Sequence, residues 1–345
     1  MKTRMLIAVL AAASAGTAVP AAAEEPIVFQ PGHPSLKRFL LPERPPHPVG
    51  NAPNPERVEL GKMLFFDPRL SRDGNMSCAS CHNPSLGWSD GLPTARGAKS
   101  QVLGRATPTV TNTGFNSIQM WDGRKATLED QAMGPMEASV EMNADLERVF
   151  KWLGGNAEYR ASFARAYPGE GVNRETFSKA IASFERTVVS NDSPFDRWAK
   201  GDARAMSPAQ VRGFQLFAGK GNCLTCHSGA NFTDNGFHNV GLASSARPDA
   251  DPGRFAERPL PLMKGAFKTP TVRDVEYTAP YFHDGSAKTL MEVVEHYDRG
   301  GDVKNVSPNM RPLGLSAREK EDLVAFMLAL SSPPRRIVLP VLPKD

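Results

Sequence analysis

The chain has 345 residues, of which 40% are hydrophobic and 23% charged. This composition is typical of folded globular proteins and excludes a disordered one. The net charge is only +4 and the Lys and Arg residues form no run, so no nucleic-acid partner is expected. The length allows two domains, and the 29 glycines and 30 prolines predict long loops.

The first 23 residues have the pattern of a secretory signal peptide. Lys2 and Arg4 give a positive start, residues 5–13 are apolar, and 21–23 form an Ala-Ala-Ala cleavage site. The apolar run is too short to span a bilayer comfortably, and no later stretch of about 18 apolar residues follows. We therefore expect a cleaved, exported chain in a bacterial periplasm without stable membrane insertion; an uncleaved anchor is the alternative.

In chain order, the apolar periodicity predicts helices rather than strands. Each half of the chain has one helix before its pair of cysteines and another that can pack on it. The predicted helices cover residues 58–66, 174–189, 209–217, 289–297 and 316–330. The sequence thus predicts an all-α fold with two tandem domains, 24–190 and 191–345, joined through a polar stretch near 190–207.

All four cysteines lie in two C-x-x-C-H motifs. This is the attachment signature of c-type haem, in which two thiols bond to the porphyrin edge and the adjacent His supplies a nitrogen to the iron. The residues concerned are Cys78, Cys81 and His82 in the first motif and Cys223, Cys226 and His227 in the second.

Three other interpretations of these cysteines are weaker. An exported protein commonly forms disulfides, but the spacing here follows the haem motif twice. A structural zinc site would need two histidines that are far apart in sequence, and a thioredoxin-like redox pair does not require the trailing His. We therefore predict two covalently bound haem c groups in cytochrome c-like helical domains.

Several longer motifs carry a resemblance to a known family. They lie at residues 64–71, 107–110, 121–124, 131, 134–135, 139–142, 194–196 and 280–285. With them the sequence resembles the bacterial di-haem cytochrome c peroxidase family, which includes the MauG protein of methylamine utilisation. The resemblance extends from about residue 59 to residue 330, and implies that the N-terminal haem cleaves hydrogen peroxide while the C-terminal haem stores or relays electrons.

The resemblance also implies residue roles. His82 and His227 would be the proximal iron ligands, Trp121 would lie between the haems, and Gln131 and Glu141 would line the distal pocket of the first haem. Cleavage of peroxide needs a group that moves a proton between its two oxygens, and a carboxyl with a pKa raised by burial suits that task. Glu141 lies between two apolar residues.

Two departures from the family pattern distinguish this chain. Some members hold a second His sixteen residues after the first motif; here that residue is Ala98, and no His occurs between His82 and His227. We expect the first iron to be open to peroxide without prior reductive activation.

The second departure is Tyr297, which stands where ordinary peroxidases have a Met ligand to the second haem. Tyrosinate is a hard anionic donor that favours oxidised iron, and Tyr at this position resembles MauG. The alternative is that Tyr297 is a core residue and Met291 or Met310 binds the iron.

Four further residues match family motifs. Arg273 and His283 would lie near the second haem, where they either contact its propionates or serve as structural residues. The family commonly holds a calcium ion between its haems through backbone carbonyls and an Asn. Thr278 and Pro280 match the carbonyl positions, whereas Ala106 occupies the Asn position.

The main functional hypothesis is a periplasmic di-haem peroxidase that reduces hydrogen peroxide to water with electrons from a small c-type cytochrome or cupredoxin. The alternative is a MauG-like enzyme that uses the oxidising equivalents of peroxide on Trp or Tyr side chains of a partner protein. Gly221 replaces the surface Trp of MauG, so oxidation of a partner would need another exit, Trp198 or Trp152. A non-enzymatic electron carrier is a third hypothesis.

Overall fold

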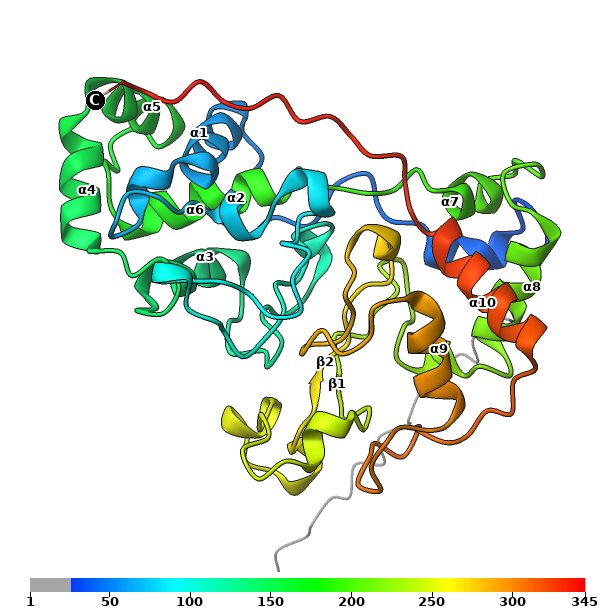
Figure 1. Cartoon of the computed structure of the whole chain (residues 1–345). Helices are drawn as coiled ribbons and strands as arrows, with labels where there is room; N and C mark the ends of the chain where they lie inside the picture. The colour runs from blue at the N-terminus through cyan, green and yellow to red at the C-terminus, as the bar shows by residue number, and fades with distance from the viewer. Residues whose placement is uncertain (1–25, 345) are drawn as a thin grey trace, which may run out of the picture.

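The computed structural model describes residues 26–344 and places its helices in two lobes (Figure 1). The predicted signal peptide lies outside the described residues. The first lobe contains α1 (Pro55–Phe66), α2 (Cys78–Cys81), α3 (Leu128–Glu137), α4 (Leu146–Gly155), α5 (Ala157–Ala166) and α6 (Arg174–Glu185). The second contains α7 (Pro194–Ala199), α8 (Pro208–Ala218), α9 (Leu290–Asp298) and α10 (Ala317–Ala329).

Among the described residues, strand structure is limited to β1 (Phe237–His238) and β2 (Phe267–Lys268), which pair antiparallel with Phe237 opposite Lys268. Many short 3₁₀ turns and long loops connect the helices. The predicted all-α fold class is therefore confirmed. No helix in the described part of the chain has the length and hydropathy needed to cross a membrane.

Local capping explains where the helices begin and end. α1 starts three residues earlier than predicted, because Asn54 accepts a hydrogen bond from Arg57 N at 3.1 Å and Pro55 suits the first helical position. Ser316 and Glu319 form the capping box predicted for α10. α6 ends at Glu185, four residues before the predicted limit.

The core of the first lobe forms where α1 crosses α6. A Cβ atom on Gly61 would lie 1.9 Å from Ala180 O, so only glycine allows this close approach. The rings of Phe65 and Phe184 then pack 5.2 Å apart between the two helices. α3, α4 and α5 surround this pair and complete the apolar cluster.

The second lobe repeats the same crossing with α8 and α10. A Cβ atom on Gly213 would lie 1.9 Å from Asp322 O, and the rings of Phe217 and Phe326 pack 5.1 Å apart. The two lobes are thus built on the same helix pair, with glycine at each crossing.

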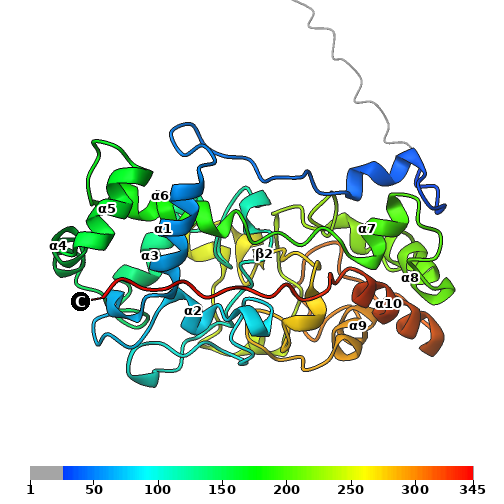
Figure 2. The same ribbon diagram turned by 90° about the horizontal axis from the view of Figure 1, so that it is seen from above.

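The segments at the two ends of the chain exchange lobes. Leu36 and Phe39 are buried in the core of the second lobe, whereas residues after α10 run back along the first lobe, where Lys344 O accepts a hydrogen bond from Asn156 Nδ2 at 2.6 Å. Figures 1 and 2 show the N-terminal segment beside the second lobe and the C-terminal segment running back along the first. The prediction of a polar linker near 190–207 is wrong in part, because this stretch contains α7, in which Phe195 and Trp198 are buried. The predicted domain boundary at residue 190 lies just before α7 and places this helix in the second domain.

A longer repeat relates residues 106–135 to residues 268–297. Thr-Pro-Thr-Val occurs at 107–110 and at 269–272. Met120 and Phe282, at matching positions, have φ values of 72° and 71°. Thr127 and Thr289 cap α3 and α9 in the same way.

The two copies of this repeat meet across the lobe boundary in a reciprocal arrangement. Ala106 N donates to His283 O, and its counterpart Lys268 N donates to Trp121 O, both at 2.7 Å. Trp121 and His283 are therefore equivalent residues that face one another, with ring centroids 6.4 Å apart. The interface between the lobes has an approximate internal two-fold symmetry.

Candidate functional site

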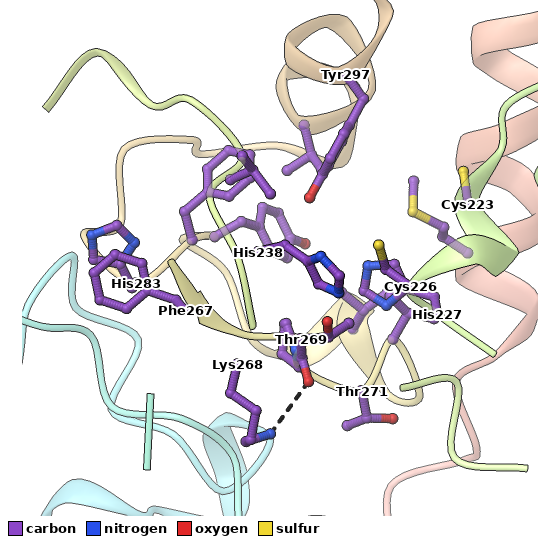
Figure 3. A pocket seen from close by; sticks show the side chains of 18 of the residues that line it. Cys223, Cys226, His227, His238, Phe267, Lys268, Thr269, Thr271, His283 and Tyr297 are labelled. Carbon is purple, nitrogen blue, oxygen red and sulfur yellow. Dashed lines mark hydrogen bonds between the residues drawn. The ribbon is translucent and has the colours of Figure 1, made fainter. Parts of the chain in front are cut away.

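The second lobe encloses a cavity of about 290 Å³. Its wall includes Cys223, Cys226, His227 and Tyr297. His227 Nδ1 donates to Phe232 O at 3.1 Å, which leaves Nε2 as the nitrogen with the free lone pair. Figure 3 shows the His227 ring and the Tyr297 hydroxyl pointing toward the same space from opposite sides.

The chemistry of this wall fits a covalently attached haem. The four cysteines are unpaired, and burial raises the pKa of Cys81 to about 11 and that of Cys223 to about 12, so these thiols are poor redox nucleophiles. A neutral imidazole and a phenol face each other across a mostly apolar space. His227 and Tyr297 are therefore suitably placed to hold an iron from both sides.

The two methionines considered as alternatives to Tyr297 differ in position. Met310 lines the same cavity, whereas Met291 is not among its lining residues. Burial raises the pKa of the Tyr297 phenol well above its usual value. The geometry thus leaves Tyr297 and Met310 as candidates for the distal ligand.

In the first lobe, His82 has the same surroundings as His227 has in the second. His82 Nδ1 donates to Trp88 O at 3.2 Å, and the ring of Phe65 lies 6.4 Å from the imidazole, as Phe217 lies 6.2 Å from His227. Cys78 and Cys81 are on α2, immediately before His82. Nε2 of His82 is again the nitrogen left for a metal.

The distal side of the first site differs from that of the second. α3 is the counterpart of α9, and the internal repeat places Pro135 at the position of Tyr297. Proline has no side-chain atom that could bind iron. Gln131 lies one turn earlier on α3, and Met142 N donates to Pro135 O at 3.0 Å, which folds the following turn back onto the helix.

That turn carries Glu141, which is half-buried. Burial raises the pKa of Glu141, and Arg124 lowers it by a smaller amount. Ala98 N donates to Glu141 O at 2.8 Å, so the position that holds a distal His in some family members packs directly against Glu141. Gly97 permits this contact, because a Cβ atom there would lie 1.8 Å from Val140 O.

Trp121 lies at the boundary between the two lobes and lines the cavity of the second. Its Nε1 donates to Ala106 O at 2.9 Å. The adjacent Asp122 pairs with Arg105 at 2.6 Å, and Arg105 also pairs with Asp251 of the second lobe at 2.7 Å. These ion pairs hold the Trp121 turn in place.

Arg273 and His283 have different surroundings. Arg273 is buried and its guanidinium donates to both oxygens of Asp196 at 2.9 and 3.0 Å and to the carbonyls of Phe39 and Ala230, which favours the structural role. The His283 ring stacks on Phe267 with centroids 3.5 Å apart, and burial lowers its pKa to about 4. His283 is therefore a neutral neighbour of Trp121.

The structure also brings together residues that sequence reasoning treated separately or missed. Thr278, Pro280 and Ala106 all line the same cavity. Pro135 and Lys268 did not appear among the predicted site residues. The repeated Thr-Pro-Thr-Val motif is the signal that could have identified both, because it aligns Pro135 with Tyr297 and Lys268 with Ala106.

The comparisons with known proteins agree with this architecture. A family model described as di-haem cytochrome c peroxidase matches residues 55–204, and a cytochrome c model matches residues 210–331. The chain is 46% identical over 308 residues to the methylamine utilization protein MauG of Methylorubrum extorquens, covering 89% of this chain and 87% of that protein. The chain belongs to the di-haem cytochrome c peroxidase family.

Other members of this family are also similar. The chain is 37% identical over 309 residues to the cytochrome c551 peroxidase of Pseudomonas aeruginosa, covering 88% of this chain and 86% of that protein. The crystal structure of a MauG-like protein associated with microbial copper homeostasis superimposes with a TM-score of 0.79 at 31% identity, covering 84% and 94% of the two chains. Membership implies two haem c groups and makes the protein an oxidoreductase of the di-haem peroxidase type.

Proposed function

We propose that this protein reduces hydrogen peroxide to water in the periplasm, with electrons from a small c-type cytochrome or cupredoxin. The observation that carries the proposal is the difference between the two distal walls. The second site presents Tyr297 opposite His227, whereas the first has Pro135 at the corresponding position and the half-buried Glu141 on the turn that follows. Peroxide would bind at the first site.

The residues around the first site have complementary tasks in this reaction. Bound haem supplies the iron that binds peroxide and exchanges electrons. Glu141 accepts the proton of the inner peroxide oxygen and delivers it to the outer oxygen, which leaves as water. The Gln131 amide holds the peroxide by a hydrogen bond. Two electrons and two further protons complete the conversion of one peroxide to two waters.

Trp121 provides the electronic connection between the sites. Its indole lies between the lobes and its hydrogen bond to Ala106 O keeps it in one orientation. The neutral His283 ring faces it at 6.4 Å. An aromatic ring in this position shortens the distance that an electron must tunnel between the two irons.

The alternative function is the MauG-like oxidation of Trp or Tyr side chains on a partner protein. Tyr297 and the 46% identity to a MauG protein favour it. An exit to the surface is then needed. Trp198 is only 2% exposed, whereas Trp152 is half-buried and lies 5.6 Å from the ring of Tyr159, so Trp152 is the better candidate.

Both hypotheses require the diferric holoenzyme to react with peroxide, and stopped-flow mixing tests this reaction. We expect rapid reaction without prior reduction. Fast turnover with reduced cytochrome c supports the peroxidase; a long-lived oxidised state that cytochrome c does not discharge supports the alternative. Two six-coordinate irons with no fast reaction would contradict both and leave an electron carrier.

We propose Tyr297 as the distal ligand of the second haem. A Tyr297→Met variant should raise the reduction potential of this haem, because a thioether favours reduced iron more than tyrosinate does. Met310→Leu is the matched control and should leave the potential unchanged. If Met310→Leu changed the potential and Tyr297→Met did not, Met310 would be the distal ligand.

A calcium ion held by the carbonyls of Thr278 and Pro280 is a further proposal. Both residues line the cavity of the second lobe, as Ala106 does, but Ala106 supplies no side-chain oxygen. Metal analysis of the purified holoenzyme before and after chelation tests the site. Absence of calcium with unchanged activity would refute it.

The periplasmic location rests on residues 1–23 alone. We expect the mature protein to begin at Glu24. Mass spectrometry of the protein recovered from a periplasmic fraction gives its first residue directly. An intact N-terminus in a membrane fraction would instead support an uncleaved anchor.

A further inference from the structure

Lys268 is a buried cation beside the cavity of the second lobe. Its side chain is 8% exposed and it belongs to β2, whose pairing with β1 fixes the backbone. The structure gives its Nζ one hydrogen bond, to Thr269 O at 3.3 Å. Figure 3 shows this bond on the side of β2 that faces away from Tyr297.

A single distant carbonyl does not satisfy a buried ammonium group. Lysine has three N–H donors, and removing its charge from water costs several kcal/mol unless an anion is close. Among the described residues no carboxylate forms an ion pair with Lys268, and Asp234 acts on it only as a more distant charge. Burial lowers the pKa of Lys268 to about 8.

The position of Lys268 indicates what the missing anion is. The residue lines the same cavity as His227 and Trp121, and its backbone N–H donates to Trp121 O. A haem attached through Cys223 and Cys226, which lie at the turn after α8, would carry its two propionates on the edge opposite its thioether bonds. We propose that Lys268 forms an ion pair with a haem propionate at the boundary between the lobes.

The internal repeat shows that this lysine is present on only one side of the interface between the lobes. Ala106 is the counterpart of Lys268, so the equivalent position in the first lobe has no charge. A positive charge next to a haem favours the reduced iron, because oxidation adds a positive charge. Lys268 therefore contributes to a difference in reduction potential between the two haems.

Spectroelectrochemical titration of both haems in the holoenzyme tests this role. Lys268→Met should increase the ratio of oxidised to reduced iron at a fixed potential at least tenfold for one haem, which is about 59 mV. Lys268→Arg should retain most of the native value. The haem that shifts is the one whose propionate is bound.

Lys264→Met is the matched control, because Lys264 is exposed and lies four residues away on the same segment. It should leave both potentials unchanged. If both potentials of Lys268→Met equal those of Lys264→Met, the ion pair does not exist.

A second measurement avoids dependence on the folding of the methionine variant. Resonance Raman spectra of the native and Lys268→Arg holoenzymes report the propionate bending vibration, which shifts when its donor changes from an ammonium to a guanidinium. Identical bands would overturn the inference. The proposed ion pair requires two bound haems but not the peroxide chemistry. Identical Raman bands would therefore leave the proposed peroxidase reaction untouched, and an enzyme without peroxidase activity could still show the shifted band.

Discussion

The two lobes share their proximal architecture and differ on the distal side. In both, a glycine allows two helices to cross, a phenylalanine packs beside the haem-motif histidine, and a backbone carbonyl accepts the hydrogen bond from its Nδ1. On the distal side, α9 has Tyr297 where α3 has Pro135. One scaffold can therefore give two iron environments through a change at one helix position.

The two lobes also differ in the segment that follows the distal helix. The turn after α3 carries Glu141 and folds back onto Pro135. α9 ends in a turn at Gly300 and Gly301, and the segment beyond it returns to the cavity with Met310 and Leu313. The side chain that we propose as the acid–base group, Glu141, thus comes from the connection after α3 and not from the shared helix pair. We expect substitutions in the distal walls to change reactivity, and substitutions at the crossings to change stability.

The largest expected effect is that of Glu141→Gln. Loss of the acid–base group should slow the reaction of the diferric enzyme with peroxide by about 10²–10⁴-fold. The carboxylate form must accept the first proton, so the native rate should fall as pH decreases through the raised pKa of Glu141, above the ordinary Glu value. Stopped-flow rates across pH give this profile; an acid limb that persists unchanged in the variant would exclude Glu141.

A variant at Pro135 tests whether the two distal walls are truly equivalent. Pro135→Tyr places a phenol at the position of Tyr297. It should add a ligand to the first iron, which we expect to be open to peroxide, and should slow the binding of peroxide. Electron paramagnetic resonance of the diferric protein reports the coordination. Pro135→Ala is the control, because it removes the ring without adding a ligand. A high-spin signal that is unchanged in Pro135→Tyr would show that the repeat does not extend to the iron.

The helix crossings should tolerate no side chain. Gly61→Ala and Gly213→Ala each place a Cβ atom within 2 Å of a backbone oxygen, and we expect a loss of about 1–3 kcal/mol in the free energy of unfolding for each. Gly154→Ala in α4 is the matched control, because nothing lies within 4 Å of its Cβ, and it should gain up to about 1 kcal/mol. Chemical denaturation measures all three. Equal stability of the Gly61 and Gly154 variants would contradict the close crossing.

The smallest effect is expected at the ion pair between the lobes. Asp251→Asn removes one partner of Arg105 while the pair with Asp122 remains, so the loss of stability should be about 1 kcal/mol or less. The difference from the native protein should decrease with added salt. A loss that is larger and independent of salt would indicate that Asp251 has a different role.

Sequence patterns predicted those parts of the molecule that depend on local order. Residues 209–217 show a helical period and lie within α8, and Ser316 caps α10 as expected. α7 was missed because its buried Phe195 and Trp198 lie in a polar stretch with a proline, and its burial depends on α8 and α10, which are distant in sequence.

The haem-motif residues could be predicted from the sequence because their chemistry requires a fixed spacing. The environments of other site residues could not, because they depend on long-range pairing. The bidentate bond of Arg273 to Asp196 and the meeting of Lys268 with Trp121 join segments that lie far apart along the chain. Ala98 was identified only as a missing ligand, whereas its contact with Glu141 required the three-dimensional structure.

The exchange of end segments between the lobes has a consequence for biosynthesis. Leu36 and Phe39 leave the ribosome before the other fully buried residues of the second core, yet the helices against which they pack, α7 to α10, are made last. A gene divided after residue 190 would accordingly give a second fragment without Leu36 and Phe39 in its core, and a first fragment without the tail that packs on it through Ile337. The core of the second lobe can therefore close only after α7 to α10 have been made, whereas the buried cluster of the first lobe is complete at Val188.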